Sequence, residues 1–356
     1  MPLDGISLPF YNASVQFGLF SSKKLAIDLG TSNSYVWAHG EGVVLSEPSV
    51  VAVDGVSGKV VAVGTEAHEM LGKTAAGGDL IAQKPLKEGV VADFLVTQAM
   101  IRYFLDKTLK SSRFMRPEVM VCVPAGISQV ERRAVLEATL SAGAKTAYLI
   151  EHTLAAAIGA KLPIEQATGS MIADIGGGQT GAAVISLGGT VASQTAKAGG
   201  SKIDEAVATH VRRIHNLIIG ERMAEEIKIS IGSAIPQAVA KKFMEVKGRD
   251  AVLGLPKTVK VDSSEIAEAI RPALLGIVDC IKEVLEHTPP ELASDIIDRG
   301  IVLAGGGAQL RNLDRLIATQ TGVSAFLAED PTRCVIYGAG VALENVDRWR
   351  RILQAR

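Results

Sequence analysis

One acidic residue followed by three glycines stands near the centre of the chain, in residues 173–181 (Ala-Asp-Ile-Gly-Gly-Gly-Gln-Thr-Gly). Short apolar runs flank this segment, which predicts two strands joined by a glycine-rich turn. Glycine has no Cβ, so the backbone N–H groups of such a turn can approach an anion closely. Asp174 would repel a phosphate directly, so we expect a metal ion or water between them. Taken alone, the segment also fits a flexible hairpin without a ligand.

The same pattern occurs near the N-terminus, and a third glycine cluster lies near the C-terminus. Residues 23–37 predict a strand, a turn and a strand, with Asp28 at the end of the first strand. The residues of that turn are Gly30, Thr31, Ser32 and Asn33. The third cluster, after an apolar run over 301–304, is Gly305, Gly306 and Gly307. Two phosphate-binding turns with acids beside them, and a third turn for the nucleoside, predict a nucleotide held between two lobes.

The composition is that of an ordinary globular protein. The chain has 356 residues, of which 47% are hydrophobic and 21% charged, and its net charge is −1. This length suffices for one large or two medium domains, and the charge gives no general attraction to nucleic acid. The three cysteines are far apart in sequence, which is typical of a reduced cytoplasmic protein. No apolar run approaches the roughly 20 residues that a membrane-spanning helix needs.

Apolar periodicity predicts strands and helices that alternate along the chain, so the expected fold class is α/β. Ser128 and Glu131 have the spacing of a capping box, which predicts that a helix begins there. Ser263 or Ser264 is expected to cap a later helix, and Pro272 is expected to break it.

With these three turns, the chain resembles the actin, sugar-kinase and chaperone ATPase superfamily, and within it the MreB family of bacterial actins. The resemblance covers roughly residues 23–345. It includes the segments 45–52, 123–133, 169–171 with the hairpin that follows, and 288–314. It implies an actin-like α/β fold of two lobes, each with a core and a smaller insertion, around a nucleotide cleft. The implied divisions are an apolar extension (1–22), subdomain IA (23–51, 86–166 and 338–356), IB (52–85), IIA (167–201 and 266–337) and IIB (202–265).

The resemblance also implies a role at each matching position, with ATP and Mg²⁺ as the ligands. Asp28 and Asp174 would order the Mg²⁺ and its waters. Glu225 and Lys228 would reach the ribose and adenine, although their spacing alone also fits an exposed i,i+3 ion pair. The phosphates would be held by the first turn, which would contact the β- and γ-phosphates, and by the second turn as a further clamp: Gly30, Thr31, Ser32, Asn33, Gly176, Gly177, Gly178 and Gln179. The nucleotide would rest against Gly305, Gly306 and Gly307.

The chain departs from the family pattern around the expected γ-phosphate position. The family usually has Glu-Glu-Pro where residues 151–153 are Glu-His-Thr, and its second Glu orients the attacking water. Gln179, Gly181 and Ser201 replace the usual Thr, Glu and Asp.

His152 and Gln179 are therefore the candidate catalytic positions. We expect ATP binding with slow or no hydrolysis, since a protonated His beside triphosphate favours bound nucleotide. The alternatives are that His152 itself positions the water, or that it only packs between the lobes.

The function implied by the resemblance is that of a cytoskeletal polymer governed by ATP, at the cytoplasmic face of the cell membrane, that helps to organise cell shape and wall synthesis. The implied partners are other copies of the chain in filaments, the membrane surface, and membrane proteins of cell shape and wall synthesis, without nucleic acid. One alternative is a nucleotide-locked scaffold with little turnover. Another is a small-molecule kinase of the superfamily, for which we identify no catalytic Asp facing an acceptor pocket.

Two stretches are candidate membrane contacts. Residues 6–20 are apolar and include Phe10 and Phe17, while Phe114 and Met115 stand between two arginines. Apolar insertion with cationic flanks is how a weak amphipathic anchor binds anionic lipid. The alternative for the N-terminal segment is that it caps another part of the fold. The alternative for Phe114 and Met115 is ordinary packing under a loop.

Overall fold

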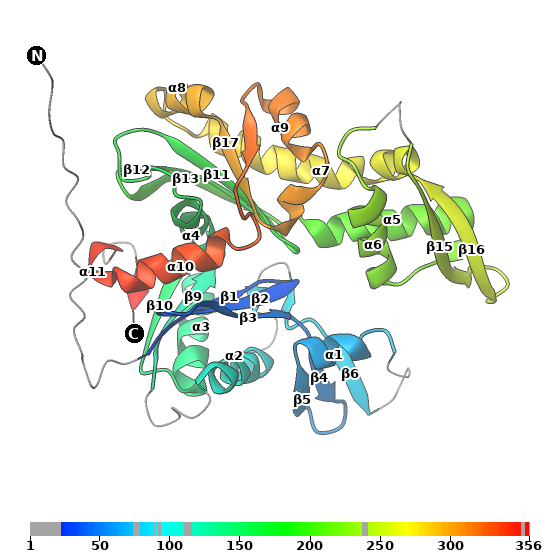
Figure 1. Cartoon of the computed structure of the whole chain (residues 1–356), viewed down its shortest axis with the longest axis horizontal. Helices are drawn as coiled ribbons and strands as arrows, with labels where there is room; N and C mark the ends of the chain where they lie inside the picture. The colour runs from blue at the N-terminus through cyan, green and yellow to red at the C-terminus, as the bar shows by residue number, and fades with distance from the viewer. Residues whose placement is uncertain are drawn as a thin grey trace, which may run out of the picture.

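The computed structural model shows two lobes, one above the other in Figure 1, each built around a β-sheet. The structure describes residues 23–73, 79–87, 90–91, 94–109, 116–236, 241–349 and 353–355. The four candidate membrane residues, Phe10, Phe17, Phe114 and Met115, lie outside these ranges. The expected α/β class and two-lobed arrangement are confirmed.

The first lobe contains a six-stranded sheet of order β19-β10-β9-β1-β2-β3. Its strands are β1 (Lys24–Leu29), β2 (Asn33–Ala38), β3 (Gly42–Pro48), β9 (Glu118–Val123), β10 (Thr146–Glu151) and β19 (Gln354–Ala355). Helices α2 (Phe94–Leu109) and α3 (Gln129–Ala142) pack on one face, against Leu25 and Ile27. Helices α4 (His152–Gly159) and α10 (Cys334–Glu344) pack on the other, against Ala26. Because side chains alternate along a strand, Asp28 belongs to the α4–α10 face.

A small sheet of order β5-β4-β6, covered by α1, projects from the first lobe. Its elements are β4 (Val51–Asp54), β5 (Val60–Val63), α1 (Thr65–Met70) and β6 (Leu80–Gln83). A two-stranded sheet, β7 (Leu86–Lys87) with β8 (Val90–Val91), leads back toward α2. The α3 helix begins with the expected capping box, in which Ser128 and Glu131 each accept a backbone N–H of the other, so that prediction is confirmed.

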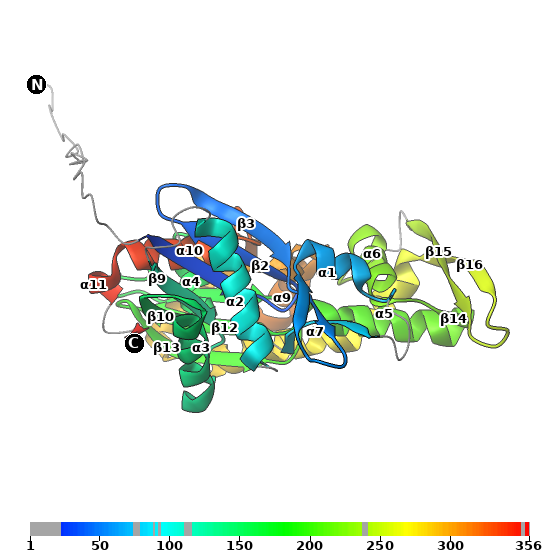
Figure 2. The same cartoon turned by 90° about the horizontal axis from the view of Figure 1, so that it is seen from below.

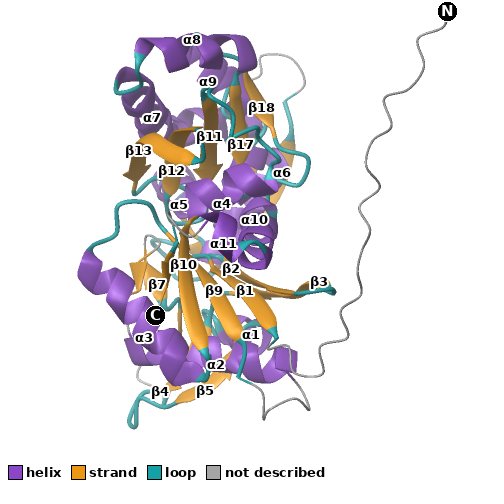
Figure 3. Ribbon diagram, turned by 90° about the vertical axis from the view of Figure 1, so that its left-hand side faces the viewer, coloured by secondary structure: helices purple, strands orange, loops and turns teal. Residues whose placement is uncertain are grey.

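The second lobe contains a five-stranded sheet of order β13-β12-β11-β17-β18. Its elements are β11 (Ser170–Ile175), β12 (Thr180–Ser186), β13 (Gly189–Ala196), α7 (Ser263–Glu286), α8 (Pro290–Arg299), β17 (Ile301–Ala304), α9 (Leu313–Thr321) and β18 (Ala325–Leu327). Ala173 and Ile175 of β11 pack into a core with α7 and α9, whereas Ile172 packs toward α4 and α10. Asp174 therefore also belongs to the α4–α10 face. Figure 3 shows this helix pair between the two sheets.

An outer part of the second lobe extends to the right in Figure 1. Its elements are α5 (Gly200–His215), β14 (Leu217–Ile218), α6 (Glu221–Ile231), β15 (Phe243–Asp250) and β16 (Pro256–Asp262). After α10 the chain forms the short helix α11 (Val346–Trp349). The expected subdomain limits remain a prediction. The sheets show where the core of each subdomain lies, but they do not define the residues at which one subdomain ends and the next begins.

The sequence reasoning about α7 was wrong in two details. Asp262, not Ser263 or Ser264, caps the helix, in a capping box with Glu265. The helix also continues without a break through Pro272 to Glu286. Proline removes one helical hydrogen bond. However, α7 buries apolar side chains both before and after Pro272, and packing against the sheet outweighs this local cost.

Candidate functional site: a cleft between the lobes

A cavity of about 470 Å³ lies between the two lobes, within the size range of small-molecule sites. It is lined by all of the residues that the sequence placed in the cleft: Asp28, Gly30, Thr31, Ser32, Asn33, His152, Asp174, Gly176, Gly177, Gly178, Gln179, Glu225, Lys228, Gly305, Gly306 and Gly307. The structure thus brings together residues from five distant parts of the chain. Their individual roles toward a ligand remain predictions.

The two hairpin turns approach each other so closely that side chains on the second turn would not fit. A Cβ built on Gly177 would overlap Ser32 Oγ, and one built on Gly178 would lie 2.6 Å from Thr31 Oγ1. The second turn is also held by α5, since the N–H of Gly200 donates to Gly176 O over 3.0 Å. The close approach leaves backbone N–H groups and short hydroxyls to face the cavity, which suits an anionic ligand.

We expect Gly178→Ala to weaken binding of a fluorescent ATP analogue at least about tenfold, which corresponds to about 1.4 kcal/mol. The added methyl group would collide with Thr31, so the two turns would have to separate. Gly189→Ala is the matched control, because its Cβ would meet nothing closer than 3.8 Å. Equilibrium titration measures both affinities. Equal affinities for the two variants would contradict this account of the turns.

Asp28 and Asp174 form the acidic part of the cleft, at the ends of β1 and β11. Asp28 Oδ1 is buried and has no hydrogen-bond partner among the described residues. Burial raises the pKa of Asp174 to about 6; His152 opposes this rise and Asp28 adds to it. One buried and one half-buried carboxylate beside the phosphate-binding turns fit a Mg²⁺ ion that keeps several waters. Within the described ranges no three His, Cys, Asp or Glu side chains could hold a metal together, so phosphate and water would supply the other ligands.

His152 is the first residue of α4 and faces the acidic pair. Its Nε2 lies 3.3 Å from Asp28 Oδ1, without the alignment of a hydrogen bond. Burial lowers the pKa of His152, but the carboxylates of Asp28 and Asp174 outweigh it, and the pKa is raised. The preceding residue, Glu151, is held by Arg132 Nη2 over 2.8 Å. An imidazole with a raised pKa therefore occupies the position where the family usually has a water-orienting carboxylate.

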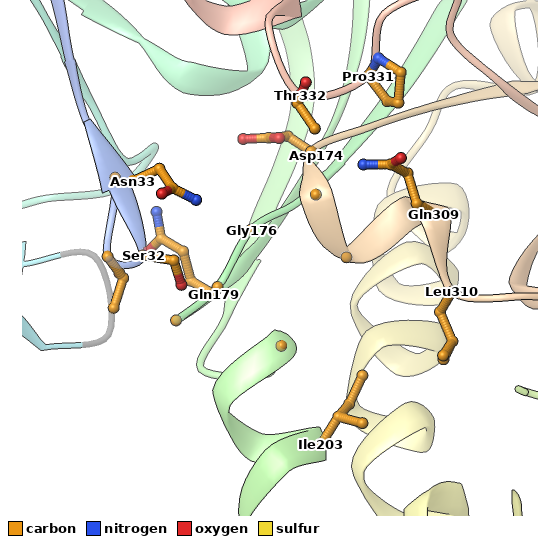
Figure 4. A pocket seen from close by; sticks show the side chains of 18 of the residues that line it. Ser32, Asn33, Asp174, Gly176, Gln179, Ile203, Gln309, Leu310, Pro331 and Thr332 are labelled. Carbon is orange, nitrogen blue, oxygen red and sulfur yellow. The ribbon is translucent and has the colours of Figure 1, made fainter. Parts of the chain in front are cut away.

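The side chain of Gln179 points from the second turn toward Ser32 and Asn33 of the first (Figure 4). An amide carries both donors and an acceptor, so it can contact a terminal phosphate oxygen or a water beside it. Gln179 is thus the candidate polar group at the place where the two turns meet.

Helix α6 forms the opposite wall of the cavity with Glu225 and Lys228. Lys228 is largely buried, and its Nζ lies 2.9 Å from Asp204 of α5 and 3.4 Å from Gly200 O. This ion pair ties the wall to the helix that supports the second turn. Separating the two side chains would leave a largely buried charge without its partner, which is costly. The pair therefore holds α6 against α5.

Several residues that line the cavity were missed by the sequence reasoning. They include Tyr35, Ile203, Gln309, Leu310, Arg311, Pro331 and Thr332. Figure 4 shows Ile203 and Leu310 near each other, away from Ser32 and Asn33, where they form an apolar part of the wall. Arg311 donates to the carbonyl oxygens of Ser230 and Gly232 and so joins α6 to the turn after β17. Leu310 and Arg311 lie in the segment 288–314 that carried the resemblance, whereas nothing in the local sequence marks Thr332.

Comparison of the sequence with known proteins places the chain in a family with the same expected fold. The family model described as MreB/Mbl protein matches residues 22–351. The chain belongs to the MreB/Mbl family. It is 50% identical over 336 residues to the cell shape-determining protein MreB of Escherichia coli K12, covering 93% of this chain and 95% of that protein. It is 46% identical over 327 residues to the cell shape-determining protein Mbl of Bacillus subtilis 168, covering 92% and 97%.

Solved structures extend the comparison of this MreB/Mbl family member. MreB5 of Spiroplasma citri bound to ADP superposes with a TM-score of 0.87 at 34% identity, over 93% of this chain and 99% of that one. A crystal structure of the same protein bound to AMPPNP matches equally well. The MamK double helical filament has a TM-score of 0.76 at 22% identity, over 92% and 99%, which shows the shared fold. The fold is therefore actin-like. In the part of the chain that the structure describes, no helix has the length and apolar character to cross a membrane.

Proposed function

We propose that this MreB/Mbl family member is a cytoskeletal protein that acts in cell shape and forms filaments governed by ATP. The observation that carries the proposal is the cleft, in which two glycine turns and the acids Asp28 and Asp174 meet between the lobes of an actin-like fold. Cell shape-determining relatives at about half identity and a filament of the same fold support it.

ATP is the proposed ligand, because a structural relative at 34% identity binds ADP and AMPPNP in the same fold. The glycine turns would hold the phosphates, while Glu225 and Lys228 would face the ribose and adenine. Mg²⁺, when bound, would neutralise phosphate charge, and Asp28 and Asp174 would orient its waters. The unpartnered oxygen of Asp28 and the raised pKa of Asp174 favour an ion between these two acids over an empty acidic pair.

We propose that hydrolysis is slow, so that the chain is better suited to holding ATP than to cleaving it. An in-line attack needs an acceptor that positions water. At that place the cleft presents His152 paired with Asp28, and its raised pKa favours the cationic form, which cannot accept a proton from water. Gln179 is the remaining candidate for this role. A nucleotide-locked scaffold is accordingly the second candidate function, and the His152–Asp28 pair is the observation that favours it.

Electron microscopy of the purified chain tests the cytoskeletal proposal. We expect filaments with ATP and fewer or shorter filaments with ADP, since lobe closure around the terminal phosphate should favour assembly. Filaments in both nucleotides would support the locked scaffold. Absence of polymer under all conditions, with ADP release stimulated by a sugar, would instead support a kinase of the same fold.

The location that we propose is the cytoplasmic face of the cell membrane, with cell-shape and wall-synthesis membrane proteins as partners. The support is the family and the apolar segments of the sequence around Phe10, Phe17, Phe114 and Met115. Sedimentation of the same filament preparation with anionic liposomes tests the lipid contact, and filaments that leave the liposomes free would contradict it.

A further inference from the structure

An ion pair connects the outer parts of the two lobes. Lys84 directly follows β6 in the small sheet of the first lobe, and Glu221 is the first residue of α6 in the second. Lys84 Nζ lies 3.0 Å from Glu221 Oε2. We propose that this pair is a latch that holds the cleft closed over a bound nucleotide and slows its release. The proposal rests on the nucleotide-binding function proposed above and concerns the regulation of that site.

The position of Glu221 on α6 places the pair at the edge of the cleft. Glu221, Glu225 and Lys228 are spaced by four and three residues, so they share one face of the helix. Glu225 and Lys228 line the cavity, and Glu221 stands one turn before them. Figure 1 shows α1 and the small sheet below α6, on the side of the first lobe that faces it, and in the view from below (Figure 2) the two regions lie over each other. Glu221 therefore extends the α6 wall of the cavity, and its contact with Lys84 connects that wall to the first lobe.

Lys84 is also electrostatically linked to the wall itself. Its side chain is only 32% exposed, compared with 73% for Glu221. Burial raises the pKa of Asp204, and the ammonium groups of Lys228 and Lys84 both oppose that rise. Lys84 thus lies close enough to the Asp204–Lys228 pair to stabilise its carboxylate. When the lobes separate, this side of the cleft loses the charge of Lys84 together with the contact to Glu221.

The connections between the lobes determine where they can open. The chain passes from the first lobe to the second through α4 and returns through α10, and these two helices pack tightly together. Opening should therefore separate the outer subdomains, where Lys84 and Glu221 meet. An ion pair at the surface contributes little free energy to a closed conformation, and salt screens it. The latch should change nucleotide release by about two- to fivefold, which suits a contact that opens in each exchange.

The test measures release of a fluorescent ADP analogue from the full chain during a chase with excess ADP at low salt. We expect Lys84→Ala and Glu221→Ala each to speed release two- to fivefold, and the double variant to be no faster than either single one. Lys84→Glu combined with Glu221→Lys should restore slow release. The controls are Lys59→Ala in the small sheet and Glu226→Ala in α6, both exposed and outside the cavity lining, and they should behave as wild type.

The outcomes separate the latch from the proposed function. An equilibrium titration of wild type comes first, and failure to bind the analogue would overturn both proposals. If wild type binds but the single variants release at its rate, or their effects add, the latch is wrong and nucleotide binding stands. Salt gives a second readout: at high ionic strength wild-type release should approach that of the variants, while their own rates change little.

Discussion

Replacing His152 by Glu is expected to raise the rate of phosphate release from ATP about a hundredfold, within the range that a positioned acid–base group contributes. The substitution would exchange a buried imidazole that faces Asp28 for a carboxylate that can accept a hydrogen bond from the attacking water. Single-turnover and steady-state phosphate release at saturating Mg²⁺-ATP measure the effect. Wild type is expected to turn over slowly in the same assay.

His152→Gln is the matched control for this prediction. Gln has the length of Glu without its charge, so it removes the imidazole but supplies no carboxylate that could take a proton from the attacking water. We expect its phosphate release to stay slow. If wild type turns over rapidly and the Glu variant is no faster, the slow-hydrolysis proposal is wrong. If neither variant changes binding or turnover, His152 acts only in packing between the lobes.

The Glu variant should also depend on the metal for stability. Three carboxylates would then lie close together at the base of the cleft, because residue 152 faces Asp28 and lies near Asp174. Like charges at such distances oppose one another. Binding of Mg²⁺-ATP to the folded state should therefore stabilise this variant more than it stabilises His152→Gln.

Gly338→Ala is expected to destabilise the chain by at least about 3 kcal/mol, at the upper end of the range for overpacked cores. Helices α4 and α10 cross with backbone in contact, and a Cβ at Gly338 would lie 2.7 Å from the carbonyl carbon of Ala155 and 2.8 Å from Gly159 N. Backbone atoms cannot rotate away as a side chain can. Thermal unfolding should show Tm lowered by roughly 5 °C or more.

Gly306→Ala is the control for crowding, because a Cβ there meets nothing within 4 Å and its backbone conformation suits any residue. Its Tm should stay close to that of wild type. If Gly338→Ala melts no earlier than Gly306→Ala, the α4–α10 crossing has room to adjust, and the helix pair would not fix the arrangement of the lobes.

Short-range features of this protein follow from the sequence alone. The strand–acid–glycine pattern around Asp28 and Asp174 predicts two hairpins with carboxylates at the strand ends, because side-chain alternation and glycine turns are local properties. The capping box at Ser128 is equally local. These features, together with the resemblance, were sufficient to anticipate an actin-like fold and to name the glycine turns and acids of the cleft, but not its apolar walls or Thr332.

Only the tertiary structure decided how these groups face one another. The contacts of His152 with Asp28, of Lys228 with Asp204 and of Lys84 with Glu221 join residues far apart in the chain, and no local pattern encodes such pairings. The unbroken course of α7 through Pro272 likewise depends on packing against the sheet. Spacing along the chain determines which side chains share an element, whereas the packing of elements determines which charges meet. For that reason the sequence indicated a nucleotide site, and the fold revealed the imidazole that faces its acids and the ion pair at its edge.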